Sequence, residues 1–417
     1  MKVNRRQLLI GAAAVGVGLS ASPVIASTTA EIVIGALYPL SGPGAQVGVD
    51  AKAAIETAVD IINTVRDLDL PTARNAGLAG LGGAKIRVIF ADHQGDPQKG
   101  RAEAERLITQ EGVCAIVGAF HSSVSATASV SCERYGIPYV AADSSSPSLN
   151  RRGLKFFFRP AAHDEMFSAA MFNFMDAERT AGKAIKSVAL FHEDTIFGTD
   201  SSTVQKQLAQ QRGFDIVADI KYRANSPTLT SEVQQLKSAD ADVLLPSSYT
   251  TDAILLVRTM SELGYKPKNI VAQAAGFAEK AVFDAVGDRL GGLISRASFS
   301  LDLAAKRPSI AAVNEMFKKR AGKDLNDNTS RQLMAMLILA DAIDRAKSKE
   351  GPTIRDALAA TDIAGQQTIM PWSKCTFDET GQNTFADPVL IQYVEKKWVT
   401  IFPKAVAVAE PVWPMQG

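Results

Sequence analysis

The amino-acid sequence predicts an α/β protein made of two lobes, each a doubly wound parallel sheet covered by helices. Three observations lead to this fold class. Short, continuous apolar segments alternate with segments of helical period, which is typical of parallel strands buried on both faces. This alternation runs once before Arg159 and starts again after it. The 417 residues also exceed what one hydrophobic core holds, so two domains are expected.

The first series of strands and helices accounts for the sequence up to Arg159. Its strands are short apolar runs, and its helices carry an apolar face, as Ala102, Leu107 and Ile108 do. The expected strands cover residues 32–37, 86–90, 114–118 and 137–142, and the expected helices cover residues 49–65, 99–110 and 123–134. Because helices separate successive strands, the strands are expected to lie parallel.

The second series follows the same rules and continues to the end of the sequence. Its expected strands cover residues 187–192, 215–222, 243–246 and 270–274, with helices at 201–212, 230–238 and 252–263. Two further helices are expected at residues 331–347 and 353–360, and two strands at 389–395 and 398–402. No low-complexity linker separates the two series, which favours a short, structured hinge.

The N-terminus has the organisation of an export signal. Three cations, Lys2, Arg5 and Arg6, precede an apolar run over residues 8–19, and small residues precede a cleavage point after Ala26. A membrane span needs about 20 apolar residues, so this run is too short to act as one. Residues 4–9 also resemble a twin-arginine signal, and the choice between the two export routes stays open. We therefore expect residues 1–26 to be a signal peptide and the mature protein to be periplasmic.

Charge and cysteine content exclude several classes of protein. The chain has 45 basic and 44 acidic residues, and removal of residues 1–26 leaves 42 basic residues. Such a balance gives no electrostatic reason to expect nucleic acid or an anionic membrane as a partner. Of the three cysteines, Cys114 and Cys132 are close enough in the predicted fold for a disulfide, or all three are buried thiols.

Motifs of the common hydrolases, metalloproteases and phosphate-binding loops are absent from the sequence. The four histidines do not share a helical face at metal-ligand spacing, and each lies near the end of an expected strand. Strand ends are where open α/β sheets bind ligands, so one or two of these histidines are expected to line a cleft. We therefore expect a binding protein, not an enzyme, that has neither a metal nor a cofactor.

Two hydroxyl-rich turns are the best candidates for a binding site. His121, Ser122 and Ser123 join an expected strand to the beginning of a helix, where unpaired backbone N–H groups favour a carboxylate. Ser122 alone is equally well explained as a helix cap. The range 143–147 ends the next strand with Asp143, Ser144 and Ser145. Adjacent strand ends lie about 5 Å apart, so the two turns are expected to face one ligand.

The order and spacing of several short segments resemble the periplasmic leucine/isoleucine/valine-binding proteins, the type I solute-binding components of ABC importers. These segments are 34–42, 92–97, 122–123, 144–147, 197–198 and 377–381, and the similarity extends over the whole mature chain. The resemblance implies lobes joined by a three-crossover hinge. Lobe one would hold residues 27–163 and 298–385, and lobe two residues 164–297 and 386–417. It also implies a monomer that closes on a small solute and docks on a membrane permease.

The resemblance also assigns roles to single residues. It places the α-carboxylate of an amino acid on Ser122 and on the turn from Asp143 to Ser145, with Asp164 near the hinge. It makes Phe197 and Tyr249 of lobe two the aromatic residues that close over the ligand. Where amino-acid binders of this family commonly have a glutamate for the ligand ammonium, this chain has Ala275.

Ala275 leaves the charge of the ligand open, because a buried ammonium needs a charged or polar acceptor. Either Asp143 or Asp164 supplies that acceptor, or the ligand has no ammonium. A branched-chain or other hydrophobic amino acid is the first expectation. The alternatives are an aliphatic or aromatic carboxylate without an amine, and a ligand sensor of the same fold.

Overall fold

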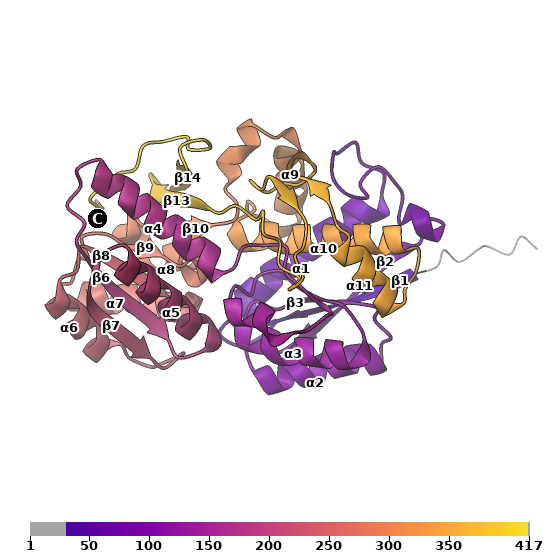
Figure 1. Ribbon diagram of the computed structural model, residues 1–417, viewed down its shortest axis with the longest axis horizontal. Helices are drawn as coiled ribbons and strands as arrows, with labels where there is room; N and C mark the ends of the chain where they lie inside the picture. The colour runs from indigo at the N-terminus through magenta and orange to yellow at the C-terminus, as the bar shows by residue number, and fades with distance from the viewer. Residues whose placement is uncertain (1–30, 416–417) are drawn as a thin grey trace, which may run out of the picture.

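The structure, a computed structural model, describes residues 31–415, so the expected signal peptide at residues 1–26 lies outside the described part. Figure 1 shows two lobes that lie side by side along the longest axis of the molecule. We define the first lobe by the sheet β2-β1-β3-β4-β5 and the second lobe by strands β6 to β10 with β13 and β14. Each lobe therefore has its own sheet, as the repeated strand and helix pattern predicts.

The sheet of the first lobe is parallel throughout. Its strands are β1 (Glu31–Tyr38), β2 (Lys85–Asp92), β3 (Ile116–Gly118), β4 (Tyr139–Ala141) and β5 (Phe157–Phe158), and its first helices are α1 (Ala45–Asn63), α2 (Pro97–Thr109) and α3 (Ser122–Tyr135). On β1, Ile34 belongs to the apolar cluster that includes α1, whereas Leu37 packs with residues of α2 and α3. Strands β1, β3 and β4 are thus buried on both faces, whereas the edge strand β2 is mostly half-buried.

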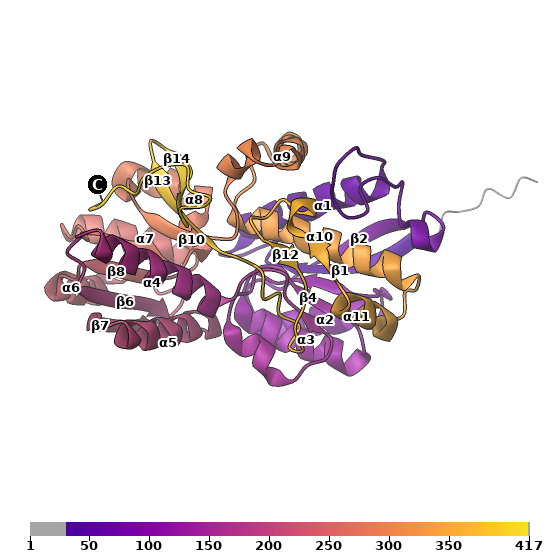
Figure 2. The same cartoon turned by 45° about the horizontal axis from the view of Figure 1, so that its top comes forward.

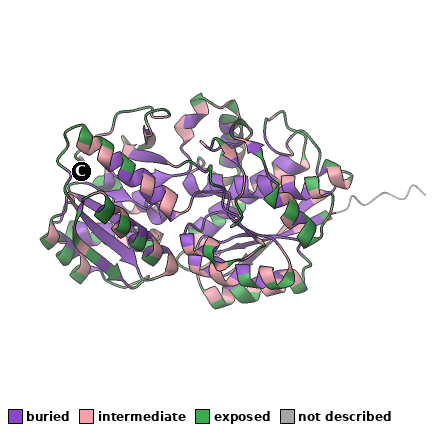
Figure 3. Cartoon of the chain, viewed as in Figure 1, coloured by how far each residue is buried: buried purple, intermediate pink, exposed green. Residues whose placement is uncertain are grey.

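The sheet of the second lobe is mixed. Its strands are β6 (Ser187–Glu193), β7 (Asp215–Tyr222), β8 (Val243–Ser247), β9 (Val271–Ala272), β10 (Ile294–Ala297), β13 (Val389–Val394) and β14 (Lys397–Phe402). A parallel bridge between Leu244 and Ile270 connects the strands β7-β6-β8 to the strands β9-β10-β13-β14. In the second group, β13 pairs antiparallel with both β10 and β14. The helices are α4 (Asp164–Thr180), α5 (Ile196–Gln211), α6 (Thr230–Ala239), α7 (Thr250–Glu262) and α8 (Lys280–Val286). Strands β6, β8, β9 and β10 are almost wholly buried, whereas the edge strands β7 and β14 have several exposed or half-buried residues. Figure 3 shows the exposed outer faces of the helices around this sheet.

The chain passes between the lobes three times: between β5 and α4, between β10 and α9, and between β12 and β13. After the second passage, α9 (Pro308–Ala321), α10 (Asp327–Ala346) and α11 (Gly351–Ala359) follow, then β11 (Ile363–Ala364) and β12 (Lys374–Cys375). Helix α10 packs on α1 and begins with a capping box between Asn326 and Thr329. Figure 2 shows α10, α11 and β12 on the first lobe. The late helices therefore return to the first lobe across a structured hinge.

Most expected elements are present within a few residues of their expected bounds. The sequence patterns did not identify α4, α8, α9, β5, β10, β11 or β12. In β10 the reason is physical, because Ser295 and Arg296 interrupt its apolar run, yet both are buried. Arg296 pairs with Asp327 of α10 at 3.1 Å, a partner that no local pattern reveals.

Cys114, Cys132 and Cys375 are all buried and free. The pairing of Cys114 with Cys132 that the sequence left open is therefore not formed. Within residues 31–415, no helix is both long and apolar enough to cross a membrane.

Candidate functional site

The first turn of α3 lies at the carboxyl end of β3 and opens the candidate site. The Ser122 side chain is buried, and its hydroxyl oxygen has no hydrogen-bond partner among the described residues. The Ser122 N–H donates to the Tyr249 hydroxyl of the second lobe at 3.3 Å. Ser122 therefore does not act as a side-chain cap, since the residue before the helix, His121, holds the N-cap position. A free hydroxyl beside helix N–H groups is a suitable seat for a carboxylate.

Asp143 follows β4, which pairs directly with β3. One carboxylate oxygen, Oδ2, accepts a hydrogen bond from Gln332 Nε2 at 2.9 Å, and the Asp143 carbonyl accepts from Arg331 Nη1 at 2.8 Å. The other oxygen, Oδ1, is buried and has no partner within residues 31–415. Burial raises the pKa of Asp143 to about 7, although the Arg331 charge opposes that shift. Asp143 thus has one carboxylate oxygen that takes no part in these hydrogen bonds, and the Tyr38 hydroxyl is among the groups that face this carboxyl.

The two serines after Asp143 differ in what they can offer a ligand. The Ser144 hydroxyl is 2.6 Å from the Ser125 hydroxyl and also donates to the Ala119 carbonyl. It therefore connects the turn after β4 to the turn after β3. Ser145 is buried, and its carbonyl accepts from the Asp164 N–H at 2.8 Å. Ser144 therefore supports the site, while a direct role for Ser145 remains a prediction.

Arg159 fixes the same turn from the interior. Its side chain is fully buried and has no carboxylate among its hydrogen-bond partners in the described chain. Nη1 donates to the carbonyls of Ser144 and Ser146 at 3.1 and 2.8 Å, and Nε donates to Gln382 at 2.7 Å. Burial lowers the pKa of Arg159 to about 9. The guanidinium therefore sets the backbone position of the Ser144–Ser146 turn.

Asp164 begins α4 at the first passage between the lobes. Its Oδ2 accepts from the Ser201 hydroxyl at 2.8 Å, and its Oδ1 accepts from Gln273 Nε2 at 2.8 Å. Both donors belong to the second lobe, and Asp164 is completely buried. Asp164 is thus committed to a hinge network, which leaves it with less capacity for a ligand than Asp143 has.

Aromatic side chains from both lobes meet above the Ser122 turn. Tyr249 lies with its ring centroid 5.0 Å from that of Phe120, 4.7 Å from that of His121 and 5.1 Å from that of Phe197. Phe197 is buried, and the lid also includes Val47 and Ala275. Burial lowers the pKa of His121 to about 4, so its ring is neutral at pH 7. The lid is therefore apolar and uncharged.

Ala275 contributes shape to this lid and no charge. It begins a short 3-10 helix, Ala275–Ala278, and both it and Ala274 have positive φ angles of 49° and 48°. A Cβ at the next position, Gly276, would come within 2.6 Å of the Thr250 nitrogen. The glycine therefore allows this loop to pack against the backbone that carries Tyr249.

Direct contacts close the lobes around the site. The Ser146 hydroxyl donates to the Asp200 carboxylate of α5, and the Thr251 hydroxyl donates to the Pro43 carbonyl at 3.4 Å. Between the lobes lies a cavity of about 100 Å³. Its walls are Pro43, Gly44, Gln94, Gly95, Phe120, His121, Ser123, Thr195, Ala224, Asn225, Tyr249, Thr250 and Thr251. The cavity between the lobes is therefore small and nearly closed, and Ser123 is one of its walls.

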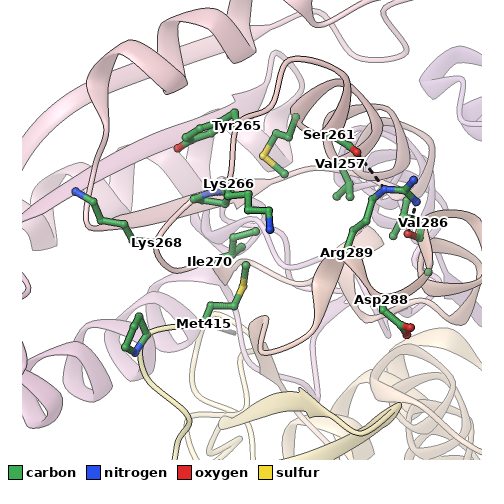
Figure 4. A pocket seen from close by; sticks show the side chains of 14 residues that line it. Val257, Ser261, Tyr265, Lys266, Lys268, Ile270, Val286, Asp288, Arg289 and Met415 are labelled. Atoms are coloured by element: carbon green, nitrogen blue, oxygen red, sulfur yellow. Dashed lines mark hydrogen bonds between the residues drawn. The ribbon is translucent and has the colours of Figure 1, made fainter. Parts of the chain in front are cut away.

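A roomier cavity of about 750 Å³ lies within the second lobe, and Figure 4 shows it from close by. Apolar residues such as Val257, Ile270 and Met415 line it. Arg289 lies at its border, where Nε donates to the Ser261 hydroxyl at 3.2 Å. None of the site residues expected from the sequence lines this cavity. Within the described chain, no group of three or more histidine, cysteine or acidic residues is arranged to hold a metal ion.

Sequence reasoning missed most walls of the interlobe cavity, Phe120 among them, and also Val47 and Glu193, which lie close to Tyr249. Val47 and Phe120 belong to the lid cluster, and Glu193 ends β6 behind it. Phe120 stands in the same turn as Ser122, so its position at a strand end was an available signal. Val47 and Glu193 reach the site only through the packing of distant elements.

Comparisons with known proteins agree with this architecture. A family model described as periplasmic binding protein matches residues 31–397. Leu/Ile/Val-binding protein homolog 7 of Brucella suis biovar 1 (strain 1330) is 28% identical over 396 residues, covering 92% of this chain and 94% of that protein.

Two solved structures share the fold at low identity. The leucine-binding protein LivK of Thermotoga maritima MSB8 superposes with a TM-score of 0.75 at 21% identity, over 88% of this chain and 97% of that chain. A solute-binding protein of an ABC transporter from Rhodopseudomonas palustris BisB5, in complex with 3,4-dihydroxy benzoic acid, superposes with a TM-score of 0.74 at 17% identity. The superposition covers 91% of this chain and 99% of that chain.

Proposed function

The chain belongs to the family of periplasmic leucine/isoleucine/valine-binding proteins, and we propose that it captures a hydrophobic amino acid for an ABC importer. One observation carries the proposal: two buried polar atoms without hydrogen-bond partners in residues 31–415, Ser122 Oγ and Asp143 Oδ1, follow neighbouring strands, and the turn that holds Ser122 contacts Tyr249 of the apolar lid. Buried polar atoms normally have partners, so this pair indicates a ligand with two adjacent polar groups.

The ligand carboxylate would bind at the N-terminus of α3. There it would accept hydrogen bonds from the Ser122 hydroxyl and from the N–H that now donates to Tyr249. The positive end of the helix dipole adds to the attraction for an anion. The ligand would thus take the place of the Tyr249 hydroxyl.

The ligand ammonium would bind Asp143 Oδ1. Strands β3 and β4 are hydrogen-bonded neighbours, and about 5 Å separates adjacent strands, a spacing that suits the carboxylate and ammonium of one α-carbon. Asp164 is the weaker candidate because Ser201 and Gln273 already occupy both of its oxygens. Ala275 supplies no acceptor side chain.

The side chain of the ligand would meet the lid formed by Val47, Phe120, Phe197 and Tyr249. These walls are apolar, so they favour an aliphatic or aromatic side chain. The printed names of the relatives, Leu/Ile/Val-binding and leucine-binding, support the same class of ligand.

A carboxylate without an amine is the second candidate. Burial raises the pKa of Asp143 to about 7, so near neutral pH a good part of this carboxyl is protonated and can donate a hydrogen bond to an anion. The aromatic lid also suits a planar ring, and the Rhodopseudomonas palustris protein of similar fold holds 3,4-dihydroxy benzoic acid.

The cellular role follows the family. We propose export through residues 1–26, a monomer in the periplasm, docking on a membrane permease, and no catalytic turnover. We also propose the lobe boundaries stated above, 27–163 with 298–385 and 164–297 with 386–417. The pairing of β10 with β13 and the packing of α10 on α1 support these boundaries.

The test is a thermal-shift screen of the mature protein after unfolding and refolding to remove bound solute. A ligand at about 100 times its Kd adds roughly 2.7 kcal/mol to the unfolding free energy, a shift that the screen detects. The panel pairs each hydrophobic amino acid with its deaminated counterpart. Stabilisation by leucine or a similar amino acid, with none from its counterpart, supports the first candidate, and the reverse supports the second. A flat response across the panel would rule out both.

A further inference from the structure

A cavity of about 520 Å³ lies beside the hinge, and its walls come from both lobes. Phe299 and Ser300 belong to the passage between β10 and α9, and Leu325 precedes α10, which packs on the first lobe. Ile391 of β13 and Trp398 of β14 are walls from the second lobe. No residue lines both this hinge cavity and the interlobe cavity. Its volume is within the range of about 300–1,000 Å³ that is typical of ligand pockets.

Most walls of the hinge cavity are apolar. Phe299 and Leu325 are buried and belong to the apolar cluster of the first lobe, whereas Ile391 belongs to a separate cluster on which Trp398 packs. Trp398 and Val399 are only half-buried, so each leaves apolar surface that the fold itself does not cover. Covering such surface with an aromatic ring is favourable, because apolar area is then removed from water.

Ser300 is a wall of the same cavity and has a hydroxyl that the fold does not use. The residue is 3% exposed, and its hydroxyl oxygen has no hydrogen-bond partner within the part of the chain that the structure describes. Ser300 directly precedes the short 3-10 helix Leu301–Ala305, yet its side chain makes no capping hydrogen bond there. Buried hydroxyls normally have partners, so this one is available to a hydrogen-bonding group inside the cavity.

The charged walls of the hinge cavity do not call for a charged ligand. The three acidic residues among the walls already interact with protein groups, namely Asp302 with Thr400, Asp324 with Lys318 and Asp327 with Arg296. The two lysines, Lys396 and Lys397, are exposed, so water solvates their ammonium groups. What the interior offers is therefore apolar surface and one hydroxyl.

We propose that the hinge cavity is a second binding site, and that it takes an uncharged aromatic molecule with one hydroxyl, such as a phenol. The ring would pack on Phe299 and Trp398, and its hydroxyl would pair with Ser300. Because both lobes supply walls while the lobes are in contact, a bound phenol favours the closed arrangement. It therefore strengthens capture of the solute, and the solute strengthens binding of the phenol by the same factor. This coupling rests on the proposed function, whereas binding of the phenol does not.

The test is calorimetry of p-cresol and of toluene, which lacks the hydroxyl, on the refolded mature protein with and without saturating solute. p-Cresol should bind about threefold to tenfold more tightly than toluene, the factor that one neutral hydrogen bond supplies, and the solute should tighten its binding further. Ser300→Ala should remove the preference for p-cresol. Val399→Trp should weaken binding of both compounds, because its ring takes up space that they need. The matched controls, Ser261→Ala and Val217→Trp, lie outside the hinge cavity and should change neither affinity.

Equal binding of p-cresol and toluene by the native protein contradicts the second site, since ordered water then satisfies the Ser300 hydroxyl. A preference that survives in Ser300→Ala, or unchanged binding in Val399→Trp, also contradicts it, because the phenol then binds elsewhere. Weaker binding of p-cresol with saturating solute indicates competition for the interlobe site, and an unchanged affinity contradicts the coupling. If the screen identifies no solute, the proposed function fails, and the experiments without solute still decide the hinge cavity. Melting temperatures show whether Val399→Trp folds, and Ser300→Ala alone decides if it does not.

Discussion

At the scale of single residues, the site depends on which polar atoms the fold has already used. The Ser144 hydroxyl and both Asp164 oxygens are occupied by protein groups, whereas Ser122 Oγ and Asp143 Oδ1 are not. Position at a strand end predicts Ser122 and Asp143 as candidate site residues, and this much can be predicted from the sequence. It does not distinguish them from Ser144, because the partner of that hydroxyl, Ser125, stands 19 residues away in α3.

Ser122→Ala should weaken solute binding by roughly 1–3 kcal/mol, because a bound carboxylate then lacks one donor. Calorimetry with the solute identified by the screen measures the loss. The control is Ser309→Ala, which makes the same change in the first turn of α9 and should leave the affinity unchanged. Binding within twofold of the native protein would remove Ser122 from the site.

Asp143 makes the affinity depend on pH in opposite directions for the two candidate ligands. Burial raises its pKa to about 7, with Arg331, Gln332, Asp327 and Tyr38 as the facing groups. An ammonium needs the ionised form, so an amino acid must displace a proton below that pH, and its affinity should rise up to pH 7 and then level off. A deaminated acid should instead lose affinity above pH 7, where the ionised carboxylate repels it.

Calorimetry between pH 5 and pH 9 distinguishes these two profiles, and Asp143→Asn is the control for both. In an amino-acid binder, that substitution should cost about 2–5 kcal/mol at pH 8 and abolish the pH dependence. A pH profile that is identical in the native protein and in Asp143→Asn would show that Asp143 does not contact the ligand.

At the scale of elements, the site is made by parallel strands whose carboxyl ends meet at one edge. The alternation of strands and helices predicts this edge, and with it the turns after β3 and β4. The sequence patterns that would predict β10 and α4 are weaker, since both elements are stabilised by residues far away along the chain. Arg296 of β10 pairs with Asp327, and Asp164 of α4 bonds to Gln273, 109 residues away. Local period and propensity contain no information about such partners.

Substitution of Arg159 tests how much the position of the turn after β4 depends on one buried side chain. Arg159→Met leaves the Ser144 and Ser146 carbonyls and Gln382 without their donors, so the unfolding free energy should fall by about 2–4 kcal/mol. Solute affinity should fall as well, because the turn loses its fixed position. Denaturant unfolding and calorimetry measure the two effects. Arg74→Met, at an arginine with a side chain 66% exposed, is the control and should change stability by no more than about 0.5 kcal/mol. Equal stability of the two variants would contradict this role for Arg159.

At the scale of the whole molecule, three chain passages join two lobes that touch through a few polar and aromatic contacts. Tyr249 reaches Ser122, and Asp200 reaches Ser146, each from the second lobe to the first. These contacts describe a closed arrangement in which the candidate site is covered from both sides. Opening about the hinge is therefore required for a solute to enter, and a bound solute that contacts both lobes favours closure.

Small-angle X-ray scattering of the refolded mature protein, with and without its solute, tests this account most directly. The solute-bound protein should give the profile calculated from the closed structure, and the solute-free protein should have a larger radius of gyration. Asp200→Ala removes one interlobe contact without touching the candidate carboxylate seat, so it should expand the solute-free protein further. Identical profiles with and without saturating solute would contradict capture by closure of the two lobes.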